Sequence, residues 1–163
     1  MAQLNDINFM LEKKSILITG GSGLLAVNWA LSTRSNYAVT LLLHHKKISL
    51  LGVETDIASL SSLDECSFIL AKHQPDIVIH TAGLTNVEEC EANPDLAQEV
   101  NVDLAKNIAI ACSSQGVKLV HISTDHLFLG DQEFTTENTS TNPVNNYAKT
   151  KLLGEQKVLE NCK

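Results

Sequence analysis

The chain is poor in several features that mark other classes of protein. Aromatic residues make up only 4 % of its 163 residues, so we expect a core built mostly from Leu, Ile, Val and Ala. No apolar run approaches the roughly 20 residues that a membrane-spanning helix needs. The first residues lack the basic start and apolar stretch of a signal peptide. These absences predict a cytoplasmic location and no membrane partner.

Paired cysteines and a basic stripe are also missing. Cys66, Cys90, Cys112 and Cys162 show no Cys-x-x-Cys spacing, so we expect free buried thiols in a reducing compartment and no metal site. The net charge of −7 leaves no basic face for a phosphate backbone, which argues against a nucleic-acid partner.

We interpret the acidic group Glu88, Glu89 and Glu91 as a solvated loop, and His80 and His121 as hydrogen-bonded core histidines.

A glycine-rich turn follows the first apolar run of the chain. Ile16 to Ile18 reads as a buried parallel strand, Gly20, Gly21 and Gly23 come next, and a helix is expected from Leu24 to Leu31. Glycines allow a close backbone approach, and the N-terminus of a helix favours negative charge. This order of strand, turn and helix predicts a site for a pyrophosphate, although a purely structural turn would look the same.

Apolar runs and helical patterns then alternate along the chain. Strands are expected at 39–43, 77–79 and 117–123, with helices at 63–73, from Pro94 to Gly116, and around Tyr147. The stretch 131–146 reads as a long loop. Such alternation predicts an α/β fold with a doubly wound parallel sheet, in which ligands bind at the carboxyl ends of the strands.

The segment Tyr147-Ala-Lys-Thr-Lys151 places a phenol and an ammonium on one face of the last predicted helix. A free tyrosine titrates near pH ~10 and is a poor acid or base at neutral pH. A neighbouring ammonium favours the phenolate, so the pair suits proton transfer. The spacing alone is a weak signal, and its weight comes from the glycine turn upstream.

Together these residues resemble the extended short-chain dehydrogenase/reductase superfamily. The motif Thr19-Gly-Gly-Ser-Gly-Leu-Leu-Ala26 and Tyr147-x-x-x-Lys151 carry this resemblance, which covers about residues 15–160. The segments Pro75 to Gly83, Thr85 to Glu91, Val100 to Val102 and Val120 to Asp125 look like the dTDP-4-dehydrorhamnose reductase group. The resemblance implies a Rossmann-type dinucleotide-binding domain over residues 1–163, lacking the substrate domain that the group carries in its second half.

The resemblance also implies a function and a set of site residues. The activity would be NAD(P)H-dependent reduction of a nucleotide-linked keto-sugar. The partners would be a nucleotide-sugar substrate and further copies of the chain in a homo-oligomer. Thr124 would hold the substrate carbonyl, with Ser123 as the adjacent candidate, Tyr147 would donate the proton and Lys151 would assist it. Residues implied at the cofactor are Gly20, Ser22, Gly23, Leu24, Leu25, His45, Lys46, Asp56, Ile57, Ala82, Gly83, Thr85, Asn101, Ser123, Tyr147 and Lys151.

Three points stay open at this level. The basic cluster His44-His45-Lys46-Lys47 follows the second strand, where a basic group accommodates the 2′-phosphate of NADP and an acid would favour NAD. We therefore expect NADP, with NAD possible. His126 stands where the group usually has tyrosine, which affects the pocket wall. The same group includes a regulatory subunit of methionine adenosyltransferase, so a non-catalytic dinucleotide-binding module and another sugar-nucleotide epimerase or dehydratase remain alternatives.

Overall fold

Five parallel strands form the centre of the computed structural model, which describes residues 13–131 and 133–162. The strands are β1 (Ser15–Thr19), β2 (Ala38–Leu43), β3 (Glu54–Ile57), β4 (Ile77–His80) and β5 (Lys118–His121). The helices are α1 (Leu24–Thr33), α2 (Leu63–His73), α3 (Val87–Ala92), α4 (Pro94–Gln98), the π-helical turn η1 (Glu99–Asp103), α5 (Leu104–Gln115), the 3₁₀ turn η2 (Asp125–Leu127) and α6 (Asn146–Asn161).

The strand order is β3-β2-β1-β4-β5, and every pairing is parallel. The chain therefore builds outward from β1 to β3 on one side and then returns to place β4 and β5 on the other. This reversal lies between β1 and β4, where open α/β sheets form a crevice at the carboxyl ends of the strands. The predicted doubly wound fold is confirmed.

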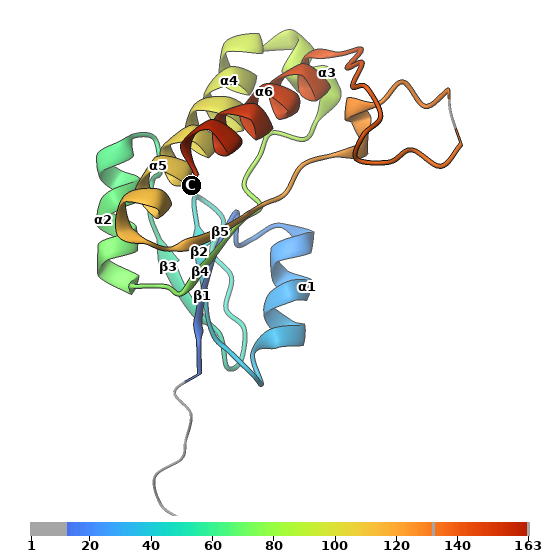
Figure 1. Cartoon of the computed structure of the whole chain (residues 1–163). Helices are drawn as coiled ribbons and strands as arrows, with labels where there is room; N and C mark the ends of the chain where they lie inside the picture. The colour runs from blue at the N-terminus through green and yellow to red at the C-terminus, as the bar shows by residue number, and fades with distance from the viewer. Residues whose placement is uncertain (1–12, 132, 163) are drawn as a thin grey trace, which may run out of the picture.

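Two apolar cores lie on opposite faces of the sheet. In one core, α1 packs on the sheet through Ile18, Ala26 and Leu41. In the other core, α2 and α5 pack on the opposite face of the sheet through Leu17 and Ile108. Figure 1 shows α1 standing apart from the layer of α2 and α5, with α6 beyond α5. Consecutive side chains of β1 are therefore buried on alternate faces of the sheet, as expected of a near-continuous apolar strand.

Helix α6 forms an outer layer that packs on α5 and η1 rather than directly on the sheet. Gly154 makes this packing possible: a Cβ there would lie 2.2 Å from the carbonyl oxygen of Asn101. Because any side chain would collide with backbone, glycine is required in the middle of this helix despite its unfavourable helix propensity.

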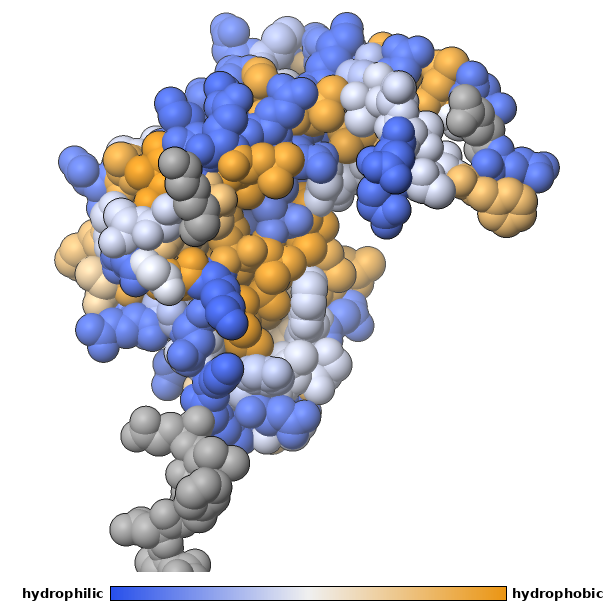
Figure 2. Space-filling model, viewed as in Figure 1, coloured by the Kyte–Doolittle hydropathy of each residue, from blue (hydrophilic) through white to orange (hydrophobic). Residues whose placement is uncertain are grey.

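Strand β5 ends the sheet, and apolar surface lies beside it. Among the described residues it pairs only with β4, and its residue Val120 is 41 % exposed. Figure 2, viewed as in Figure 1, shows apolar residues gathered in the middle of the molecular surface. Within the same described ranges, no helix combines the length and apolar character needed to cross a bilayer.

The structure corrects several of the predicted elements. Strand β3 was not expected, and the acidic segment read as a loop forms helix α3, which Asn86 caps. The long helix expected from Pro94 to Gly116 is interrupted by η1. A π-helical turn often marks a place where side chains are held for a special purpose, and Asn101 lies within it. The segment 131–146 lacks helices and strands up to the start of α6 in its described residues, as predicted.

Candidate functional site

A cavity of about 620 Å³ lies at the carboxyl ends of the strands. Its lining residues come from the segments that follow all five strands and from helices η1, α5 and α6. They are Gly20, Ser22, Gly23, Leu24, Leu25, Leu42, Leu43, His44, Ala58, Ser59, Leu60, Ser61, Thr81, Ala82, Gly83, Thr85, Glu99, Val100, Leu104, Ile122, Ser123, Tyr147 and Lys151. The fold therefore brings the glycine turn and the Tyr–Lys pair to one cavity, although 124 residues separate Gly23 from Tyr147 in the sequence.

The glycine turn is held tightly at the end of β1. Gly20 has a φ of 65°, and a Cβ at this position would lie 2.8 Å from the backbone nitrogen of Ala82. Gly23 N–H donates to the carbonyl of Gly20 at 2.8 Å, and no side chain caps α1 at Gly23. The first N–H groups of α1 are thus left for a ligand, and the site suits an anionic group.

Tyr147 is positioned by two caps at the start of α6. The Asn145 side chain accepts from Ala148 N–H, and the Glu91 carboxylate accepts from the backbone and side-chain N–H groups of Asn146 at 2.6 and 3.0 Å. The Tyr147 ring is buried against Cys90 and Ala97, and the edge of the His126 ring meets it with centroids 5.5 Å apart. The residue that departs from the group's pattern therefore touches the predicted proton donor.

Lys151 is buried beside the end of β5. Its side chain is 5 % exposed, and Nζ donates to the carbonyl oxygen of Ile122 at 2.6 Å. Burial lowers the pKa of this ammonium below its ordinary value, and the charge of Glu155 opposes that change. The side chain lines the cavity, in the place that an assistant to Tyr147 would need.

The two adjacent hydroxyls of the predicted site have different partners. Ser123 Oγ donates to Glu155 Oε2 at 3.0 Å, and Ser123 lines the cavity. Thr124 Oγ1 accepts from the backbone N–H of His126 at 3.3 Å and so caps η2. Thr124 is not among the lining residues.

Asn101 is a buried polar residue whose side chain hydrogen-bonds to neighbouring segments and does not line the cavity. Its side chain accepts from Leu84 N–H at 2.8 Å and donates to Leu84 O and to Thr150 Oγ1. It therefore connects η1, the segment after β4 and helix α6. Such a link fixes the wall segment Ala82–Gly83 relative to the helix that carries Tyr147.

Beneath the cavity, two histidines lie side by side on β4 and β5. His80 and His121 are register partners with ring centroids 5.3 Å apart, and His80 Nδ1 shares a hydrogen bond with Thr19 Oγ1 at 2.7 Å. Burial, with the charge of Lys151, lowers their pKa to about 3 and about 4, so both are neutral at pH 7. The expectation of hydrogen-bonded histidines is right for His80 Nδ1 and wrong for the other three ring nitrogens, which have no protein partner.

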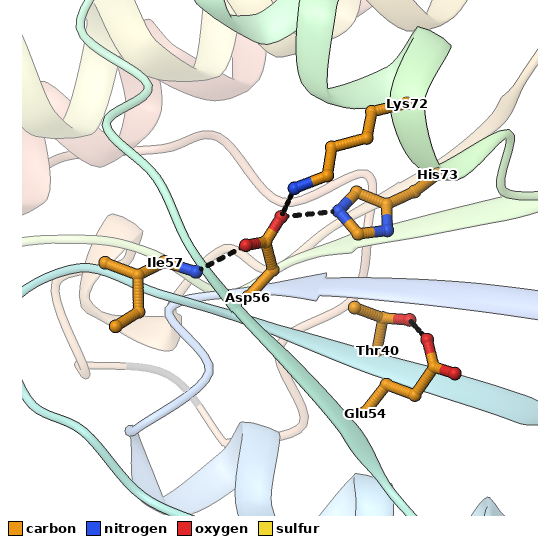
Figure 3. Close-up of polar contacts among 6 residues, drawn as sticks. All are labelled: Thr40, Glu54, Asp56, Ile57, Lys72 and His73. Carbon is orange, nitrogen blue, oxygen red and sulfur yellow. Dashed lines mark hydrogen bonds and ion pairs between the residues drawn. The ribbon is translucent and has the colours of Figure 1, made fainter.

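Asp56 faces α2 instead of the cavity. One carboxylate oxygen accepts from Lys72 at 2.6 Å and contacts His73 at 2.8 Å, and the other accepts from Ile57 N–H (Figure 3). The bond from Lys72 is the main cause that lowers the pKa of Asp56 to about 2. The carboxylate therefore joins β3 to α2, and the cavity wall beyond β3 begins at Ala58.

The cavity contains most but not all of the predicted cofactor residues. The cofactor residues outside its lining are His45, Lys46, Asp56, Ile57 and Asn101, and the predicted catalytic residue Thr124 is outside it as well. The rings of His44 and His45 are tilted against each other with centroids 3.6 Å apart, and Lys46 is exposed.

Residues 58–61 and Glu99 line the cavity without having been predicted as site residues. Recognition of β3 would have indicated residues 58–61, because they follow its carboxyl end.

The strand order, the glycine turn and the cavity together define a Rossmann-type α/β protein with a site for a dinucleotide. Residues 14–163 match the family described as RmlD substrate binding domain, and the chain belongs to this family.

Named relatives fall into two groups. The chain is 39 % identical over 92 residues to dTDP-4-dehydrorhamnose reductase of Salmonella typhimurium, covering 56 % of this chain and 31 % of that protein. It is 32 % identical over 153 residues to methionine adenosyltransferase 2 subunit beta of Bos taurus, covering 93 % of this chain and 44 % of that one.

A solved structure supports the same relationship. The dTDP-4-dehydrorhamnose reductase of Bacillus anthracis, in complex with NADP, superposes with a TM-score of 0.76 at 28 % identity, covering 92 % of this chain and 50 % of that one. The chain thus spans half or less of the length of these relatives.

Proposed function

We propose that the protein reduces a carbonyl group on a nucleotide-linked sugar with NADPH as the hydride donor. The observation that carries this proposal is the shared cavity, in which the glycine turn lies near one wall and Tyr147 and Lys151 lie at another. The named reductases among its relatives support the substrate class.

The residues present fit a dinucleotide. The backbone at Gly20 passes too close to Ala82 for any Cβ, and the start of α1 has no side-chain cap, so its N–H groups can receive a pyrophosphate. His44 lines the cavity after β2, with Lys46 nearby in the sequence, where a 2′-phosphate would be accommodated. The nicotinamide would supply the hydride.

The protein's own groups would supply the proton. Tyr147 would give its phenolic proton to the carbonyl oxygen as the hydride reaches the carbon, which converts the ketone to an alcohol. Lys151 would stabilise the phenolate that forms. The hydroxyl of Thr124 donates to Asp125 Oδ1 and lies outside the cavity lining, so it takes no part in this step. A positioned general acid of this kind contributes about 10² to 10⁴ in rate.

The test is turnover of dTDP-4-dehydrorhamnose by the full-length protein with NADPH, followed by loss of nicotinamide absorbance. Turnover that depends on both molecules supports the proposal. Binding of NADPH without turnover of any nucleotide-linked keto-sugar would favour a second candidate, a regulatory dinucleotide-binding subunit. The match to methionine adenosyltransferase 2 subunit beta over 93 % of the chain favours that candidate specifically.

A further inference from the structure

Two side chains one turn apart tie helix α6 to the end of strand β5. Lys151 Nζ donates to Ile122 O at 2.6 Å, and Glu155 Oε2 accepts from Ser123 Oγ at 3.0 Å. Residues four apart share one face of a helix, so the ammonium and the carboxylate both face this strand end. Ile122 and Ser123 are consecutive residues of the cavity wall.

The charge on Glu155 matters because the neighbourhood of Lys151 otherwise disfavours an ammonium. Burial lowers the pKa of Lys151, and the two histidines beside it stay neutral at pH 7 because burial holds their pKa near 3 and 4. Glu155 is the one carboxylate of the described chain whose charge is found to raise the pKa of Lys151. It is half-buried, which limits screening by water.

The hydrogen bond to Glu155 also decides what Ser123 can offer a bound molecule. A serine hydroxyl has a single proton, and this one is donated to Glu155. Toward the cavity, Ser123 therefore presents lone pairs only. It can accept from a hydroxyl or an amide N–H of a ligand, but it cannot donate to a carbonyl oxygen.

We propose that Glu155 is a positioning residue, which fixes Ser123 as a hydrogen-bond acceptor and supports Lys151 in its ammonium form. This inference rests on the proposed function for its meaning, because it removes Ser123 as a hydrogen-bond donor to the substrate carbonyl. Glu155 touches neither substrate nor cofactor in this role and acts through its two neighbours.

The experiment compares three variants of the chain, Glu155→Gln, Ser123→Ala and Glu160→Gln. Glu155→Gln removes the charge and keeps the shape, whereas Ser123→Ala removes the hydrogen bond and keeps the charge. Glu160→Gln is the matched control, because it removes a carboxylate of the same helix that pairs with Lys157 at the surface. The readouts are the titration of Lys151 by nuclear magnetic resonance of its labelled ammonium, and NADP affinity by calorimetry between pH 6 and 10.

In Glu155→Gln the titration midpoint of Lys151 falls, and the alkaline loss of NADP affinity begins at a lower pH than in the unsubstituted chain. On that alkaline side Glu155→Gln binds NADP about tenfold more weakly than the unsubstituted chain does, because a tenfold change in affinity corresponds to the loss of about one hydrogen bond to a charged group. Ser123→Ala and Glu160→Gln leave the midpoint of Lys151 in place. Amide spectra show whether each variant is folded, and Glu155→Asp, which keeps the charge, restores the midpoint.

Equal midpoints for Lys151 in Glu155→Gln and Glu160→Gln overturn the inference, whatever the cofactor does. If the unsubstituted chain binds no NADP, the proposed function loses its support in this chain, but the lysine titration still decides the role of Glu155. A Glu155→Gln chain that fails to fold leaves the decision to Glu155→Asp, whose Lys151 midpoint must match that of the unsubstituted chain.

Discussion

Tyr147 is the single residue on which the proposed chemistry depends most. The change Tyr147→Phe removes one hydroxyl and keeps the ring that packs on Cys90 and Ala97. In the full-length protein we expect kcat to fall by about 10² to 10⁴, with little change in cofactor affinity, because the hydroxyl serves the substrate. Steady-state kinetics with NADPH measure this. Tyr37→Phe, at the other tyrosine of the chain, is the control, and an unchanged kcat in Tyr147→Phe would remove the catalytic role.

Lys46 and Lys47 are the residues expected to set the preference for NADP over NAD. No acid lies between Tyr37 and Val53, so we expect the chain to bind NADP more tightly than NAD. The double change Lys46→Glu with Lys47→Glu should weaken NADP and leave NAD nearly unaffected, as measured by calorimetric titration of both. The double change Lys149→Glu with Lys157→Glu on α6 makes the same change in net charge and is the control. Equal affinities in the unsubstituted chain would contradict the prediction.

Asp56 makes stability depend on pH. Its pKa is lowered from the ordinary 3.8 to about 2, so it stabilises the fold above pH 4 and loses this effect as the pH falls through about 2. Lys72 is half exposed, and screening by water reduces the effect to about 1 kcal/mol. We expect Asp56→Asn to lower the free energy of unfolding by that amount at pH 7 and by little at pH 2, in denaturant titrations. Asp131→Asn, at an exposed site, should change neither; an equal loss at both pH values would show that the ion pair is not the cause.

At the scale of elements, α6 lies so close to η1 that there is no room for a side chain at Gly154. Gly154→Ala should destabilise the chain by about 1–3 kcal/mol, because its Cβ would meet the carbonyl of Asn101. Helix propensity alone predicts the opposite sign, a gain of about 1 kcal/mol. Thermal unfolding separates the two, with Lys149→Ala as a control on the exposed face of α6. A variant more stable than the unsubstituted chain would mean that α6 does not pack this closely.

How much of this could be read from the sequence differs between elements. The strands and helices with long apolar patterns, and the cap at Ser62, were predictable because their signals are local. Strand β3 was missed because Glu54 to Ile57 is short, mostly polar and at the edge of the sheet. Helix α3 was missed because its acidic residues look like a solvated loop, whereas Glu91 caps α6 from 55 residues away. The partners of Asp56 and Ser123 are likewise set by packing between distant elements, which no local pattern contains.

At the scale of the whole molecule, one sheet edge and an apolar surface are left open. Strand β5 has no partner beyond β4 among the described residues, and Val120 is exposed on it. We expect the chain to self-associate as its concentration rises. Sedimentation velocity over a range of concentrations measures this association, and Val120→Lys should reduce it. A strictly monomeric chain would contradict this prediction.

The outer position of α6 has a consequence for how distant substitutions act on rate. The glycine turn follows strand β1 of the sheet, but Tyr147 lies on a helix that packs on α5 and η1, so the two sides of the cavity belong to different layers. A displacement of about 1 Å between reacting groups can cost on the order of 10²-fold in rate. Small changes in side-chain volume between α5 and α6, far from any ligand, would therefore alter turnover while leaving the binding of the dinucleotide's phosphates intact.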